Sequence, residues 1–255
     1  MKRTPADETD IDFAVEAAVA AGDLTLDWFQ RSGLAVDRKD DGSPVTAADR
    51  AAERLIRDRL ADRFPNDTVI GEEEAETAGR SGRTWVIDPV DGTKAFTRGV
   101  PLFSTLVALV DDEGPAVGVI HLAGLGETVW AGRGRGAFHN DEPCRVSGHP
   151  RLEDAYVCTS GFSYWRQSHL ARVLDSGAKL RTWGDAYGYF LVATGRAEAM
   201  IDPECFDWDV APIAVIIAEA GGIFTDRDGR ESWTSGSGVA TNGLIHTDAL
   251  AWLAD

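Results

Sequence analysis

Residues 85–93 read Trp85-Val86-Ile87-Asp88-Pro89-Val90-Asp91-Gly92-Thr93. The apolar first residues predict a buried β-strand that breaks at the proline. Two carboxylates spaced three residues apart then precede a glycine and a hydroxyl. A plain turn would also explain this composition, because aspartate, proline and glycine each have turn chemistry of their own.

The same stretch also fits a site for a cation and a phosphate. Pro89 fixes φ so that Asp88 and Asp91 can aim at one point, and the carbonyl of Val90 lies between them as a further oxygen. Gly92 and Thr93 would open a helical turn whose free N–H groups suit a phosphate.

Two further acidic segments follow elsewhere in the chain. Glu72 is the first of three glutamates after Ile70-Gly71, where a solvated face or a helix start is the plain interpretation. Asp209 precedes a helix predicted over residues 210–220, which it could cap. Cations such as Mg²⁺ prefer oxygen ligands, and a pair of these ions can clamp an in-line displacement at phosphorus. Oxygens for such a site are offered by Glu72, Asp88, the Val90 carbonyl, Asp91 and Asp209.

The composition is that of a globular protein with a full core, because 44% of the 255 residues are hydrophobic and 26% are charged. With 25 basic and 42 acidic residues the net charge is −17, which repels polyanions, so nucleic acid is not an expected partner. The acidic surplus does suit cations, whose charge can invert the electrostatics of a site. The five histidines show no metal-binding spacing, which disfavours a zinc hydrolase.

Cysteine usage and hydropathy indicate the compartment. Three cysteines without C-x-x-C spacing argue against a disulfide framework, so we expect free thiols in the core. The N-terminus lacks the apolar stretch of a secretory signal, and the longest apolar run, residues 211–218, is too short to cross a bilayer. These features predict a cytoplasmic protein with no membrane contact.

Hydrophobic periodicity organises the first half of the chain. Apolar residues at three- and four-residue steps predict a helix over residues 12–30. A strand over 36–39 and a turn over 40–44 precede a second helix that begins at Thr46, with Asp49 completing a capping box. Short strands separated by glycine then predict a meander, with strands at residues 68–70, 84–87, 104–110, 116–122, 128–131 and 137–138.

The second half of the chain follows another pattern, in which strands alternate with helices, and this predicts a sheet covered on both faces. We expect strands at residues 155–159, 180–182, 197–201 and 223–225, and helices at residues 163–174, 186–194 and 210–220. The fold class is therefore α/β. The chain is predicted to divide into an α+β domain, 1–145, that binds metal and phosphate, and an α/β domain, 146–255, that completes the site.

Four motifs together resemble the inositol monophosphatase-like family of Mg²⁺-dependent, lithium-sensitive phosphatases. They are Gly71-Glu72-Glu73, Asp88-Pro89-Val90-Asp91-Gly92-Thr93, Trp208-Asp209-Val210-Ala211 and Glu219-Ala220-Gly221-Gly222. The resemblance implies a layered αβαβα sandwich, a homodimer, and two or three Mg²⁺ ions per site, with Mn²⁺ as an alternative. It also implies the metal ligands Glu72, Asp88, Val90, Asp91 and Asp209.

The resemblance implies further roles close to these ligands. Asp49 and Thr93 match the pair that orients and deprotonates the attacking water, and Glu72 belongs with them to the catalytic set. The capping box remains the alternative role of Asp49. The backbone amides of Gly92 and Thr93 match the cradle for the substrate phosphate, and Asp209 also belongs to the substrate-binding set.

Within the family, two stretches are similar to the histidinol-phosphatase branch. They are Thr182-Trp183-Gly184-Asp185-Ala186-Tyr187-Gly188-Tyr189 and Ala240-Thr241-Asn242-Gly243-Leu244-Ile245-His246. Polyol phosphatases commonly carry Gly-Thr or Gly-Ser in place of Gly184-Asp185, and Lys94-Ala95 departs from the Thr-Asn of the inositol pattern. The substrate of this branch carries an ammonium group, to which a carboxylate in a partly dehydrated pocket supplies a charge-assisted hydrogen bond.

Asp185 and Asp202 are the candidates for that carboxylate. A helix cap is the alternative role of Asp185, and a turn before Pro203 is the alternative role of Asp202. The resemblance thus implies a phosphomonoesterase that hydrolyses histidinol phosphate in histidine biosynthesis by attack of metal-activated water. Inositol 1-phosphate, or another sugar or nucleotide phosphate, is the alternative substrate. A regulatory binding protein that keeps the fold is the alternative of a different class.

Overall fold

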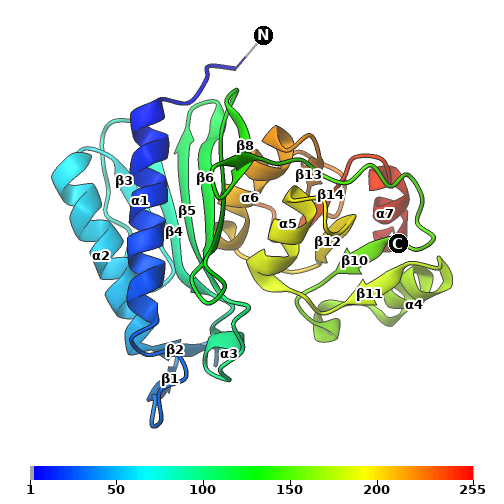
Figure 1. The fold of residues 1–255 in the computed structure, drawn as a ribbon, viewed down its shortest axis with the longest axis horizontal. Coiled ribbons are helices and arrows are strands. Elements are labelled where there is room, and N and C mark those ends of the chain that lie inside the picture. Colours follow the sequence, from blue (N-terminus) through cyan, green and yellow to red (C-terminus); the bar gives the residue numbers. More distant parts are fainter. Residues whose placement is uncertain (1–2, 255) are drawn as a thin grey trace.

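The computed structural model describes residues 3–254, and its elements are stacked in layers (Figure 1). From one end to the other, a pair of helices, a sheet, a second pair of helices, a second sheet and a last pair of helices follow one another. This arrangement is the predicted αβαβα sandwich. The division of the chain into domains at residue 145 stays a prediction.

The first sheet has the order β3-β4-β5-β6-β7-β8-β9, and all neighbours are antiparallel except β3 and β4. It is the predicted meander with one additional strand, β9, that was not predicted. Its strands are β3 (Thr68–Gly71), β4 (Thr84–Asp91), β5 (Ser104–Asp111), β6 (Gly114–Leu122), β7 (Glu127–Gly132), β8 (Gly136–His139) and β9 (Glu142–Pro143).

Strand β4 is longer than predicted, because the sequence analysis expected it to break at Pro89. It continues to Asp91, with a shift in its pairing to β5 between Asp88 and Asp91. A proline cannot donate to the ladder and is tolerated at such an irregularity. The shift places both aspartates at the carboxyl end of one strand.

Helices α1 (Glu8–Thr25) and α2 (Ala47–Arg63) cover the outer face of this sheet. Helix α1 begins earlier than predicted, because Asp7 caps it by accepting a hydrogen bond of 2.8 Å from the Thr9 amide, and it also ends earlier than predicted, at Thr25. Helix α2 begins after Thr46 in the predicted capping box. Before it, β1 (Val36–Arg38) pairs with β2 (Pro44–Thr46), a strand not predicted, across the predicted turn.

The second sheet has the order β11-β10-β12-β14-β13. Strand β10 is parallel to both of its neighbours, and β14 is antiparallel to β12 and β13. The strands are β10 (Tyr156–Cys158), β11 (Lys179–Arg181), β12 (Ala199–Asp202), β13 (Ile223–Thr225) and β14 (Gly238–Thr241). Sequence periodicity predicted all of these strands except β14.

Helices cover both faces of the second sheet, as predicted (Figure 1). Helices α5 (Asp185–Ala193) and α6 (Asp207–Glu219) pack between the two sheets, and α4 (Gln167–Asp175) and α7 (His246–Leu253) cover the far side. Helix α7 was not predicted. Helix α4 starts later than expected because residues 162–164 form a separate 3₁₀ turn, η1 (Phe162–Tyr164).

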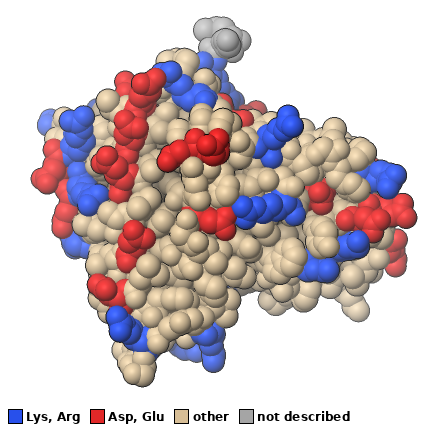
Figure 2. All heavy atoms as spheres, in the orientation of Figure 1, with Lys and Arg blue, Asp and Glu red and all other residues tan. Residues whose placement is uncertain are grey.

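The cysteines, the surface charges and the helices can be compared with the expectations of free thiols, an acidic surface and no membrane span. Cys144, Cys158 and Cys205 are all free, and Cys158 is fully buried. On the face shown in Figure 2, basic and acidic side chains lie interspersed. Across residues 3–254, no helix is both long enough and apolar enough to cross a membrane.

Candidate active site

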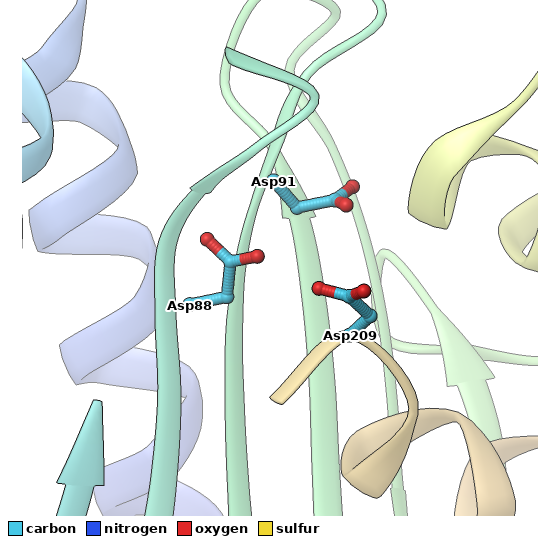
Figure 3. A group of neighbouring side chains, drawn as sticks. All are labelled: Asp88, Asp91 and Asp209. Carbon is cyan, nitrogen blue, oxygen red and sulfur yellow. The ribbon is translucent and has the colours of Figure 1, made fainter. Parts of the chain in front are cut away.

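Three aspartates converge where the carboxyl end of β4 meets the N-terminus of α6 (Figure 3). One carboxylate oxygen from each of Asp88, Asp91 and Asp209 lies within 4.8 Å of the other two. Asp209 is the third residue of α6, and its carboxylate accepts a hydrogen bond of 2.8 Å from the amide of Phe206, the N-cap residue. It is therefore not the N-cap itself, but it contributes a capping bond from the first turn of the helix. The structure therefore brings these three predicted site residues together.

The electrostatics of this cluster favour a bound cation. Burial, followed by the charges of Glu72, Asp91 and Asp209, raises the pKa of Asp88 well above its usual range. Burial and nearby carboxylates do the same for Asp91, and they raise the pKa of Asp209 to about 7. Like charges held this close resist ionisation unless a positive charge joins them. The residues present therefore fit a divalent cation with oxygen ligands.

Glu72 lies directly after β3 and next to this cluster. Its backbone amide donates to the Ile87 carbonyl at 3.2 Å, and its carboxyl group is close enough to hydrogen-bond Asp88. Neither a solvated face nor a helix start describes the three glutamates, because they are partly buried and lie outside any helix. Two of them, Glu72 and Glu73, bind the Lys39 ammonium, at 2.6 and 2.7 Å.

Lys39 is a site residue that sequence reasoning missed. It follows β1 and reaches across to the carboxylates after β3. Burial lowers the pKa of Lys39, but the hydrogen bonds that it donates to Glu72 and Glu73, together with the charges of these carboxylates, outweigh this effect and raise the pKa to about 12. The only hint of this role in the sequence was a lysine that directly precedes a predicted turn, in a chain with many acidic residues. Residue spacing alone could not have identified its partner.

Asp49 and Thr93 are in contact. Oδ1 of Asp49 lies 3.3 Å from the Thr93 hydroxyl, while its Oδ2 accepts bonds from the Thr46 amide at 2.8 Å and hydroxyl at 2.6 Å. The geometry of Asp49 is thus compatible with both interpretations: Oδ2 makes the capping-box bonds and Oδ1 contacts the Thr93 hydroxyl. Burial raises the pKa of Asp49. The Thr93 hydroxyl also lies 2.9 Å from the Val90 carbonyl, one of the expected metal ligands.

Gly92 and Thr93 connect β4 to the short helix α3 (Thr93–Phe96). Gly92 has a φ of 78°, and a Cβ there would lie 3.0 Å from the Leu102 carbonyl oxygen and 3.2 Å from the Asp185 carboxylate. Only glycine fits this left-handed and crowded position without strain. The chain can therefore turn directly beside the aspartate cluster.

The first residue of α5 is Asp185, whose carboxylate lies near enough to Asp91 for its charge to raise the pKa of Asp91. The N-cap of α5 is Gly184, so the helix-cap interpretation of Asp185 is wrong. A Cβ on Gly184 would lie 2.2 Å from the Ser160 Cα, so only glycine lets α5 begin this close to β10. Burial raises the pKa of Asp185, whereas the charge of Lys94 and a bond to Ser160 lower it.

Asp202 ends strand β12 and is buried. Its carboxylate accepts a bond of 3.2 Å from the Ser160 amide, so it is tied to the end of β10 and not to the turn that follows. Burial raises the pKa of Asp202 to about 7. Ser160 links the two candidates, because its hydroxyl accepts a bond of 2.8 Å from the Asp185 amide.

Of the carboxylates described above, all except Asp49, Glu73 and Glu74 line one pocket of about 610 Å³. Its lining includes one basic residue, Lys94, and three exposed or partly exposed aromatic side chains, Tyr164, Phe206 and Trp208. A pocket this acidic repels an anionic substrate unless cations are bound. The eight acidic residues are Asp41, Glu72, Asp88, Asp91, Asp185, Asp202, Glu204 and Asp209.

Comparison with known proteins identifies the family. A model of the inositol monophosphatase family matches residues 6–254. The chain belongs to the inositol monophosphatase family. It is 41% identical over 247 residues to a histidinol-phosphatase of Chlorobaculum parvum, with 95% of each chain covered. It is 39% identical over 253 residues to a histidinol-phosphatase of Mycobacterium tuberculosis, covering 96% of this chain and 97% of that one.

Solved structures share the fold of this chain. The extragenic suppressor protein suhB of Bartonella henselae is 31% identical and superposes with a TM-score of 0.90, covering 97% of this chain and 99% of that one. Family membership makes the protein a phosphoric monoester hydrolase, in a family that depends on metal ions. The aspartate cluster is where the residues of this chain fit a metal.

Proposed function

We propose that this protein is a Mg²⁺-dependent histidinol-phosphatase that converts histidinol phosphate and water to histidinol and phosphate in histidine biosynthesis. The observation that carries the proposal is the position of Asp185 and Asp202, two buried or partly buried carboxylates in the same pocket as the aspartate cluster. The names of the two relatives at about 40% identity support the same substrate.

The metal site would use oxygens that the fold already brings together. Asp88, Asp91 and Asp209 form its centre, with the Val90 carbonyl and Glu72 at its border. Two or three Mg²⁺ ions, or Mn²⁺, bound there would neutralise the phosphate charge and activate the attacking water. Glu72 would join the site once Lys39 leaves its carboxylate. Inhibition by lithium is part of this proposal.

The protein's own residues handle the proton and the phosphate. Thr93 lies between the metal cluster and Asp49, so its hydroxyl can accept a proton from the attacking water and pass its own to Asp49. Burial favours the protonated form of Asp49, which suits a proton acceptor. The amides of Gly92 and Thr93, at the start of α3, would bind phosphate oxygens.

We propose that the enzyme recognises the leaving alcohol by its positive charge. The ammonium of histidinol phosphate would pair with Asp185 and Asp202, whose ionised forms are costly in a buried pocket without a cation. A neutral polyol offsets the free-energy cost of ionising these buried carboxylates less well than an ammonium does. We expect discrimination against inositol 1-phosphate on this ground.

Release of inorganic phosphate across a substrate panel tests the proposal. The panel contains histidinol phosphate, inositol 1-phosphate, fructose 1,6-bisphosphate and 3′-phosphoadenosine 5′-phosphate, each with and without Mg²⁺. A preference in kcat/KM for histidinol phosphate of about 100-fold, or about 2.7 kcal/mol, is expected. A preference for another member would refute the substrate, and inactivity on all of them with Mg²⁺ bound would favour a regulatory binding protein.

The assembly and the compartment complete the proposal. A homodimer is expected, and light scattering after size exclusion would measure its mass. The three free thiols support a reducing, cytoplasmic location. The expected partner is a small phosphorylated substrate. We expect no binding to nucleic acid or to membranes.

A further inference from the structure

Tyr164 stands at the rim of the substrate pocket and already contacts a cation. It belongs to η1 and is 37% exposed. The Lys94 ammonium donates a hydrogen bond of 3.1 Å to its hydroxyl and lies 5.7 Å from the centre of its ring. The ammonium is therefore held by the hydroxyl, close to the plane of the ring, and the ring itself lines the pocket.

The segment that carries Tyr164 is hydrogen-bonded to both proposed ammonium-binding residues. Ser160 binds Asp202 through its amide and the start of α5 through its hydroxyl. The next residue, Gly161, packs against the Tyr164 ring, since a Cβ there would lie 3.5 Å from it. The same short segment thus sets the position of the ring relative to Asp185 and Asp202.

The structure of the proposed substrate places its imidazole near this ring. In histidinol phosphate the ammonium is on the carbon next to the one that bears the phosphate ester, and the imidazole is one carbon further. With phosphate at the aspartate cluster and ammonium at Asp185 and Asp202, the imidazole extends toward the mouth of the pocket. The exposed aromatic side chains of the lining are Tyr164 and Phe206, and Phe206 already stacks on Trp208 at 4.9 Å.

We infer that Tyr164 is a specificity-determining residue whose ring binds the imidazole of the leaving alcohol, an inference that rests on the proposed histidinol-phosphatase function. Stacking suits a neutral imidazole and a cation–π contact suits its protonated form. The Lys94 ammonium lies on the hydroxyl side of Tyr164, so the imidazole can pack against the ring while Lys94 keeps its hydrogen bond.

Tyr164→Ala and Tyr164→Phe test this inference, with Phe162→Ala as the matched control. Phe162 lies in the same turn and is 51% exposed, but it does not line the pocket. The probes are histidinol phosphate as substrate and ethanolamine phosphate as competitive inhibitor. Ethanolamine phosphate keeps the phosphate and the ammonium and lacks the ring, so its inhibition constant reports the rest of the site.

Tyr164→Ala is expected to lower kcat/KM for histidinol phosphate by about tenfold, chiefly through KM, and to change the inhibition constant of ethanolamine phosphate less than about twofold. Tyr164→Phe keeps the ring and should stay within about threefold of wild type, as should Phe162→Ala. An equal loss for both probes, or no loss for either, would overturn the inference. If the wild-type enzyme does not hydrolyse histidinol phosphate, the proposed function fails first and the inference falls with it.

Discussion

The backbone amide of Ala186 donates a hydrogen bond of 2.7 Å to Oδ2 of Asp91. This bond joins the start of α5 to the end of β4, so it connects the helix layer between the sheets to the first sheet. The Ser104 hydroxyl donates to the same oxygen at 3.0 Å. Both bonds lower the pKa of Asp91, although burial and neighbouring carboxylates raise it more. The orientation of Asp91 is therefore set before any metal binds.

Asp91→Asn should nearly abolish turnover and leave the fold intact. The amide oxygen of asparagine can still accept the Ala186 bond, but the charge that would bind a cation is lost. We expect kcat to fall at least 100-fold and the apo protein to melt no lower than wild type, because one repulsive carboxylate is gone. Phosphate release and a thermal melt measure the two effects.

Asp207→Asn is the matched control for this prediction. Asp207 opens the helix that carries Asp209 but does not line the pocket. It should keep most of the wild-type activity and the Mg²⁺-dependent rise in melting temperature. Normal activity of Asp91→Asn would remove Asp91 from the proposed ligands.

The two roles of Asp49 can be separated by substitution. Asp49→Asn can still accept the Thr46 amide bond, yet it cannot take a proton from Thr93, so kcat should fall by about 10²- to 10⁴-fold with little change in stability. Thr46→Ala removes the capping hydroxyl and should cost about 1 kcal/mol of stability with less than a tenfold loss of kcat. Urea unfolding and phosphate release measure both variants. The reverse pattern would make Asp49 a capping residue only.

The stability of the metal-free protein should fall as pH rises from about 4 to about 7. Burial and like charges raise the folded-state pKa of Asp202 and Asp209 to about 7, and that of Asp88 and Asp91 above its usual range. In this interval the folded state binds more protons than the unfolded chain, so the free energy of unfolding decreases with pH. Melting temperatures in EDTA across this interval measure the effect.

Saturating Mg²⁺ should reverse this decline at neutral pH. A ligand that binds only the folded state at 100 times its dissociation constant adds about 2.7 kcal/mol. Asp209→Asn should flatten the EDTA profile, whereas Asp58→Asn, on the exposed face of α2, should leave it unchanged. A wild-type profile that does not vary with pH in EDTA would contradict the raised pKa values of the cluster.

Gly118 holds α6 close to the first sheet. A Cβ at this position would lie 2.3 Å from the Pro212 carbonyl oxygen, which is backbone and cannot move aside by rotation. Gly118→Ala should therefore cost about 1–3 kcal/mol and weaken Mg²⁺ binding by displacing Asp209. Gly148→Ala is the control, because nothing lies within 4 Å of its Cβ. Equal stability of the two variants would show that α6 adapts freely.

Several elements could be predicted from the sequence because their signals are local. The capping box of α2 is formed by Thr46 and Asp49, and both residues lie within one helical turn. The strands of the first sheet are short, apolar and separated by turns, so periodicity locates them within a few residues. The aspartates of the cluster were also predicted to share a site, on motif resemblance together with Mg²⁺ chemistry.

Other features depend on packing between segments that are far apart in the chain. Lys39 binds Glu72, and Tyr164 contacts Lys94. The residues of each pair are far apart in the sequence, and hydrophobic periodicity does not predict such contacts. Helix α7 and strand β14 were missed, and Asp185 was open to a capping role until the position of Gly184 against Ser160 excluded it. Side-chain type is written in the sequence, but the partner of each side chain depends on which surfaces the two sheets bury.

The sequence by itself determined which groups are available: a strand that ends in two aspartates, a third aspartate at a helix start, and an acidic composition suited to cations. Only the tertiary structure decided that Asp91 is oriented by Ala186, that Asp49 divides its two oxygens between Thr46 and Thr93, and that Lys39 binds Glu72. The physical reason is that hydrogen bonds and charge interactions act over a few ångströms, a scale fixed by the packing of α5 and α6 between the sheets.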